Sequence, residues 1–145
     1  MALTEAEIKQ AIIDTYSQVT SKGWQVAERF YSPEELEGLP VSAVELAPGV
    51  GNPVRHAGLR PGEVVLDLGS GAGIDTLQAA RKIGPTGKAI GLDQYGVINL
   101  TMQKGQVFQE MYRVLKPGGR FCVADMLVNG ELPEEVLNHP TAWTG

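Results

Sequence analysis

The chain has 145 residues, of which 43% are hydrophobic and 20% are charged, and this balance excludes a disordered or fibrous protein. Its net charge is −5 and it holds no basic run, which argues against a nucleic-acid partner and against an anionic membrane surface. A single cysteine excludes a disulfide framework, and no apolar stretch reaches the ~18 residues of a membrane span. We therefore expect a single cytoplasmic domain over residues 1–145.

Residues 1–60 predict an N-terminal segment of helices and loops. A helix is expected over 4–19, where an apolar stripe follows Thr4 and Glu7 at the spacing of a capping box. Two further helix starts each combine a capping side chain with a following proline, Ser32-Pro33 and Asn52-Pro53.

Residues 61–145 predict a parallel α/β core. A nearly continuous apolar run over 64–68 indicates a strand buried on both faces, and a glycine cluster and a helix over 74–83 follow it. A second strand is expected over 88–92. This order of elements is typical of a Rossmann-like parallel sheet with helices on both faces.

The remainder of the core predicts fewer strands than a full sheet of this kind has. A three-residue link follows Asp93, and an apolar segment then leads into a helix whose stripe ends near Leu115. A third buried strand is expected from residue 120 or 121 to about 127, and a last helix over 131–138.

The glycine cluster predicts a ligand-binding corner. Glycines let ligand atoms approach the backbone closely, and the free N–H groups of the following helix point at the ligand. Asp93 ends the next strand, where a carboxylate typically accepts hydrogen bonds from ribose hydroxyls. The alternative is a tight turn whose glycines serve packing, with Asp93 in solvent.

The spacing of the glycines selects among nucleotide-binding motifs. Gly69, Gly71 and Gly73 form Gly-x-Gly-x-Gly, which differs from the Gly-x-Gly-x-x-Gly of nicotinamide enzymes, and Asp67 precedes them by two residues. No Gly-Lys-Ser/Thr follows, so a phosphate loop is excluded. The variant resembles motif I of class I methyltransferases that depend on S-adenosylmethionine (SAM).

Several segments, in matching order, resemble arsenite methyltransferases: Tyr31–Pro40, Gly51–Pro53, Pro61–Gly73, Ala79–Gly87, Val97–Leu100 and Val114–Arg120. The resemblance implies that SAM is the cofactor. It also implies the residues that would hold SAM: Asp67, Gly69, Ser70, Gly71, Gly73 and Asp93.

The match breaks in two places. Only residues 94–96 separate Asp93 from the segment 97–100, which resembles a segment that the family carries just after its fourth strand. The family's third strand is therefore absent, and a strand order 2-1-3 is expected. The family holds As(III) through cysteine thiolates, but Val50 and Gly96 stand at two of those positions. Cys122 is expected inside the third strand, in the core, so arsenite methylation is not expected.

The remaining reactive side chains predict no catalytic or metal site. His56 and His139 are isolated and expected at the surface, and Asp125 is expected to be a solvated acid at the end of a strand.

Two hypotheses follow from this pattern. One is a SAM-dependent methyltransferase that acts on another small-molecule acceptor, with catalytic residues unassigned. The other is a non-catalytic SAM-binding or structural remnant that acts through self-association, because a shortened sheet leaves exposed edges. Either hypothesis predicts a homodimer or a strand-exchanged oligomer.

Overall fold

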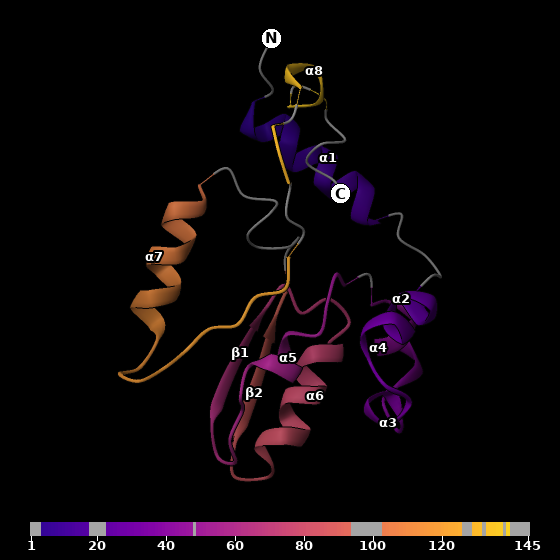
Figure 1. Cartoon of the computed structure of the whole chain (residues 1–145), viewed down its shortest axis with the longest axis vertical. Helices are drawn as coiled ribbons and strands as arrows, with labels where there is room; N and C mark the ends of the chain where they lie inside the picture. Colours follow the sequence, from indigo (N-terminus) through magenta and orange to yellow (C-terminus); the bar gives the residue numbers. More distant parts are fainter. Residues whose placement is uncertain are drawn as a thin grey trace.

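A computed structural model describes residues 4–17, 23–47, 49–93, 103–125, 129–131, 133–137 and 139. Within them the fold is mixed helix and strand, with one parallel sheet of two strands, β1 (Val64–Leu68) and β2 (Lys88–Leu92) (Figure 1). The two strands pair in register from Val64 opposite Lys88 to Leu68 opposite Leu92. Helix α6 (Ile74–Ile83) connects them. The first two predicted strands and the helix between them are thus confirmed.

The first helix begins where its capping box predicts. Helix α1 spans Glu5–Ser17, and the Thr4 backbone N–H donates to Glu7 Oε2 at 2.8 Å while the Glu7 N–H donates to Thr4 Oγ1 at 3.3 Å. The predicted continuation to residue 19 lies outside the described residues.

Two short helices also begin as predicted. Helix α3 (Pro33–Leu36) starts after Ser32 with a complete capping box that includes Glu35, and helix α5 (Pro53–His56) starts after Asn52. In each case a side-chain oxygen accepts a backbone N–H of the first turn, which needs no distant partner.

Two helices were not predicted, α2 (Gly23–Phe30) and α4 (Val41–Glu45), and they pack against each other. A Cβ at Gly23 would lie 2.0 Å from the carbonyl oxygen of Glu45, so only glycine allows this approach. The main core cluster joins this segment to the first turn of α6, and its members are Ala27, Tyr31, Leu36, Val44, Ala47 and Ile74.

The two faces of the sheet differ. Helix α6 packs against both strands on one face, and a Cβ at Gly91 would come within 2.8 Å of Thr76 Oγ1 on that helix. Alternate residues of a strand point to opposite faces. The open sheet face carries four exposed side chains: Val64 (61%), Leu66 (46%), Ile90 (38%) and Leu92 (59%). The prediction that residues 64–68 are buried on both faces is therefore wrong.

The predicted third strand is also wrong over its described part, because residues 121–125 form neither helix nor strand. The Arg120 guanidinium donates to the carbonyl oxygens of Ala57 (2.8 Å) and Gly58 (2.6 Å) and pairs with Glu63 at 2.8 Å. These contacts hold the start of the segment against the loop before β1 and not along a strand edge. Residues 126 and 127 lie outside the described residues.

Cys122, expected in the core, is exposed. Its thiol donates to the carbonyl oxygen of Pro53 at 3.4 Å. The apolar alternation around it favours a strand only where a neighbouring strand edge can pair with it, and here the backbone lies against α5.

Helix α7 spans Lys104–Val114 and has no buried residue, so its predicted stripe does not form a packed core. The Phe108 ring contacts the Phe121 ring with centroids 6.0 Å apart. Helix α8 (Glu134–Leu137) is shorter than the predicted 131–138. The predicted strand order 2-1-3 is wrong over the described residues, where the sheet consists of β1 and β2.

Candidate functional site

The turn between β1 and α6 has a backbone that favours glycine. Gly69, Gly71 and Gly73 have φ angles of +77°, +49° and +92°, a region that other residues adopt only with strain. The Gly69 and Ser70 N–H groups donate to the Leu92 carbonyl oxygen at 2.8 and 3.2 Å. The turn is therefore fixed to the carboxyl end of β2.

Space beside this turn is open. A Cβ built at Gly71 or at Gly73 would meet no atom within 4 Å. These glycines are therefore required by the backbone angles and not by packing against a neighbour. Gly73 is also the N-cap of α6, whose first-turn N–H groups have no partner within the helix. The corner thus offers backbone donors and free space to a ligand.

Two carboxylates flank the turn. Asp67, in β1, accepts a hydrogen bond from Thr76 Oγ1 at 2.6 Å. Burial raises the pKa of Asp67, hydrogen bonds with Thr76 lower it, and the charge of Asp93 adds to the rise. Asp93 is exposed directly after β2, where a ligand can reach it. The structure therefore gathers all six predicted site residues at the carboxyl ends of β1 and β2.

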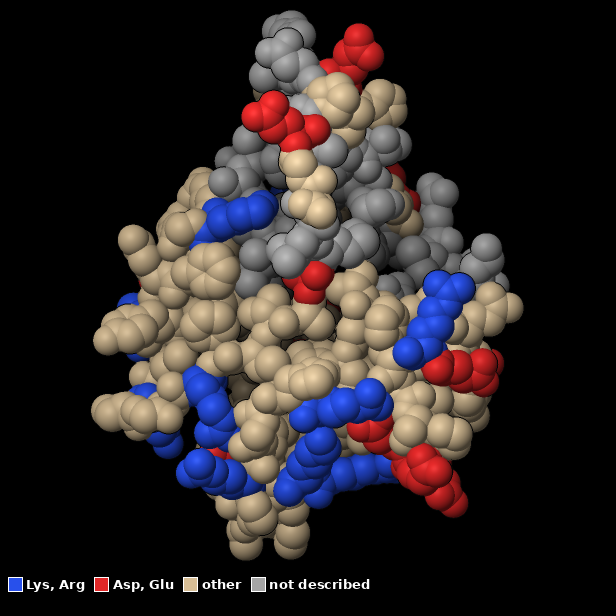
Figure 2. Space-filling model, viewed as in Figure 1, with Lys and Arg blue, Asp and Glu red and all other residues tan. Residues whose placement is uncertain are grey.

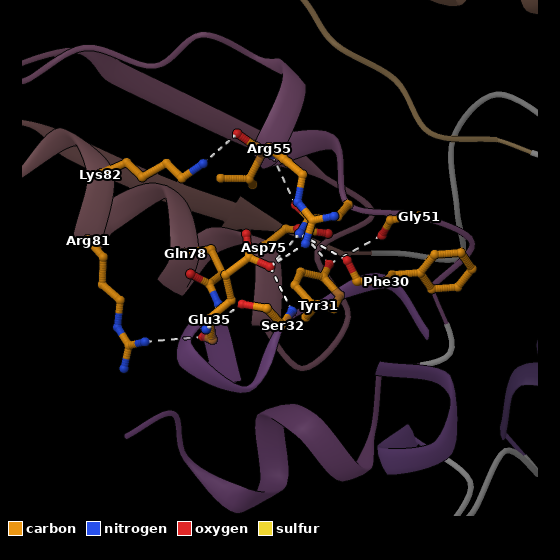
Figure 3. Close-up of polar contacts among 12 residues, drawn as sticks. Phe30, Tyr31, Ser32, Glu35, Gly51, Arg55, Asp75, Gln78, Arg81 and Lys82 are labelled. Carbon is orange, nitrogen blue, oxygen red and sulfur yellow. Dashed lines mark hydrogen bonds and ion pairs between the residues drawn. The ribbon is translucent and has the colours of Figure 1, made fainter. Parts of the chain in front are cut away.

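The sequence interpretation missed a third acid beside the turn. Asp75 lies in the first turn of α6 and its Oδ1 accepts a hydrogen bond from the Tyr31 hydroxyl at 2.7 Å (Figure 3). Burial raises the pKa of Asp75 to about 6, although this hydrogen bond lowers it, and the charge of Asp67 adds to the rise. Burial and the charge of Asp75 likewise raise the pKa of Tyr31.

Glu35 joins the N-terminal helices to α6 (Figure 3). Its carboxylate pairs with Arg55 at 2.6 Å and accepts from the Ser32 N–H at 2.9 Å, and its carbonyl oxygen accepts from the Gln78 side chain. The Arg55 hydrogen bond is the main cause that lowers the pKa of Glu35. The contacts of Glu35 thus fix the N-terminal helices against α6, next to the hydrogen bond between Tyr31 and Asp75. Only the spacing of Ser32 and Glu35 could have indicated part of this network from sequence.

The described residues contain no group of three or more His, Cys, Asp and Glu side chains that could hold a metal ion. Among the same residues, no helix has the length and apolar character needed to cross a membrane.

Comparison with known proteins identifies the relatives of this chain. It is 34% identical to an arsenite methyltransferase of Halobacterium salinarum, in a match over 70% of this chain and 37% of that protein. The chain is related to the SAM-dependent methyltransferases. Human arsenite methyltransferase is 51% identical over 47 residues, which are 32% of this chain and 12% of the human protein.

A second kind of methyltransferase also matches. The ubiquinone/menaquinone biosynthesis C-methyltransferase UbiE of Hydrogenovibrio crunogenus is 29% identical over 49% of this chain and 46% of its own length. The chain spans less than half the length of each of these methyltransferases. No family model and no solved structure matches it.

Proposed function

We propose that this chain is a methyltransferase-like protein that binds SAM at the glycine turn, on a shortened Rossmann-like core of which α6 covers one face. The observation that supports it most is the turn itself. Gly69, Gly71 and Gly73 all have positive φ, open space lies beside two of them, and Asp67 and Asp93 stand on either side.

The residues present fit the parts of SAM. The first-turn N–H groups of α6 and the turn backbone suit the carboxylate of the methionine part. The Asp93 carboxylate suits the two ribose hydroxyls, and Asp67 holds the turn in place through Thr76. When bound, SAM supplies an electrophilic methyl group on sulfur. The protein then has to orient that group and exclude water, so we assign no catalytic base.

The acceptor in this proposal is a small molecule other than arsenite. Soft As(III) prefers soft sulfur ligands, and the chain carries one cysteine. We also propose a cytoplasmic location, because the exposed Cys122 thiol is free and exposed free thiols persist in reducing compartments. The net charge of −5 supports the absence of a nucleic-acid partner.

Isothermal titration with S-adenosylhomocysteine (SAH) tests the proposal. We expect binding to the wild type and at least about tenfold weaker binding to Asp93→Asn, which loses charge-assisted hydrogen bonds to the ribose. Asp14→Asn on the exposed surface of α1 is the matched control and should bind as the wild type does. NADH should not bind. No heat with millimolar SAH, or equal affinities of wild type and Asp93→Asn, would contradict the proposal.

The open sheet face favours a second candidate, a non-catalytic remnant that self-associates. A parallel sheet is normally covered on both faces, and here four apolar side chains of one face are exposed. A second copy that docks on this face would make a homodimer, with or without exchange of a strand. Light scattering at tens of micromolar should show a dimer, and a monomer at that concentration would count against this candidate.

A further inference from the structure

A separate cavity of about 400 Å³ lies beside α5, at the carboxyl end of α2 and the segment 122–124. This volume falls within the range of small-molecule sites, about 300 to 1,000 Å³. Its wall includes Gly51, whose carbonyl oxygen lies 3.3 Å from the Tyr31 hydroxyl and shares the single proton of that hydroxyl with Asp75, 2.7 Å away. Because Tyr31 also bonds Asp75, the cavity and the glycine turn share one connecting side chain.

The cavity is basic in an acidic protein. Arg29, Arg55 and His56 line it and no acidic residue does, although the whole chain carries a charge of −5. Figure 2 shows other Lys and Arg side chains gathered over the lower half of the molecule, where α5 and α6 lie. There Arg81 and Lys82 donate to backbone carbonyl oxygens, so those cations have structural partners.

Among the described residues, Arg29 has no carbonyl or carboxylate partner of this kind. Glu35 neutralises Arg55 at 2.6 Å, but no described residue forms an ion pair with Arg29. A guanidinium presents several N–H donors in one plane. At the wall of a cavity these donors suit the two oxygens of a carboxylate.

The rest of the wall is apolar or weakly polar. Phe30, Pro53 and Val123 supply apolar surface, and the Cys122 thiol lies among them with its bond to the Pro53 carbonyl oxygen. The wall therefore combines apolar surface with polar groups that include Asn52, a combination that suits a small ligand with an apolar body and one polar group.

We propose that this cavity binds a small organic carboxylate. The anionic group pairs with Arg29, with His56 beside it, and the apolar body of the ligand lies on Phe30 and Val123. This site is independent of SAM binding at the glycine turn, so either proposal can fail without the other.

Ligand binding in this cavity can be tested through the reactivity of the single cysteine, Cys122. Iodoacetamide alkylates only Cys122, so the alkylation rate, followed by intact-protein mass spectrometry, reports on the cavity wall. We expect benzoate to slow alkylation saturably, because the bound ring covers the thiol. Sodium chloride at equal ionic strength and benzamide, the neutral analogue, should leave the rate unchanged. A rate that benzoate does not change, or that benzamide slows equally, would overturn the proposal.

Two variants that each remove one positive charge test whether Arg29 binds the carboxylate. Arg29→Gln should raise the benzoate concentration for half-protection about tenfold, because it removes a charge-assisted hydrogen bond. Lys116→Gln, at an exposed position after α7, removes the same charge and should leave that concentration unchanged. The alkylation rate without benzoate shows whether each variant keeps the wall intact. Equal effects of the two variants would overturn the assignment of Arg29.

Discussion

The two faces of the small sheet differ in the size and exposure of their side chains. On the covered face, Asp67 and Gly91 lie under α6, where the carboxylate bonds Thr76 and the glycine leaves room for that threonine and for Ser70. The open sheet face has leucine, isoleucine and valine in contact with water. The covered face thus holds one partly buried carboxylate among the small residues Val65, Ala89 and Gly91, and the open sheet face holds Lys88 beside its large apolar side chains.

In the proposed function, the covered face supports the glycine turn, and the open sheet face is the surface that a second copy would cover. The polar residues under α6 hold the glycine turn at the end of the sheet, where ligands of α/β proteins bind. The four apolar side chains of the open sheet face are of the kind that proteins normally bury, and the described residues leave them exposed.

Gly91→Val should cause the largest loss of stability. Its Cβ would lie 2.8 Å from Thr76 Oγ1 and 2.9 Å from Ser70 Oγ, so α6 and the turn would have to move. We expect about 3 kcal/mol less free energy of unfolding, measured by urea denaturation. Gly105→Ala, in open space on α7, should instead stabilise by up to about 1 kcal/mol. A neutral Gly91→Val would mean that α6 does not pack closely on this face.

Asp75→Asn should stabilise the protein at neutral pH. Because the pKa of Asp75 is raised to about 6, above the ~3.9 of an unfolded chain, its contribution to stability is fully present below pH 4 and lost as the pH rises through 6. The asparagine has no charge to bury. We expect a gain of about 2 to 3 kcal/mol at pH 7 that vanishes at pH 4. Urea denaturation across this range checks it, and a gain independent of pH would contradict the account.

Tyr31→Phe should destabilise by about 1 to 2 kcal/mol, because it leaves the buried Asp75 carboxylate without its donor. Loss of that donor should also raise the pKa of Asp75 further, so the destabilisation should grow from pH 4 to pH 7. Tyr112→Phe on the exposed side of α7 is the control and should change nothing. Equal thermal unfolding of wild type and Tyr31→Phe at pH 7 would show that the hydrogen bond does not hold this segment.

Leu92→Thr on the open sheet face should have the smallest effect on the folded monomer, within about 0.5 kcal/mol, because the side chain is already exposed. Its effect should appear in self-association instead. Light scattering as a function of concentration should show a weaker dimer than the wild type forms. A dimer of unchanged affinity would place the interface elsewhere.

Sequence reasoning found the features that are local. The capping residues Thr4 and Ser32 act within one turn of helix, and the glycines of the turn follow directly from a strand. Sequence reasoning missed the features that depend on contacts between residues far apart in the chain. Tyr31 and Asp75 are 44 residues apart. The segment 121–125 has the alternation of a strand, but the contacts of Arg120 with the loop before β1 decide its place.

The central claim, that the glycine turn binds SAM, is tested most directly by the backbone amide NMR spectrum of the full chain during titration with SAH. We predict that the amide signals of Gly69, Ser70, Gly71, Gly73 and Asp93 shift together and saturate, while those of Gly105 and Lys116 stay in place. No shift with millimolar SAH, or shifts confined to residues outside the turn, would contradict it.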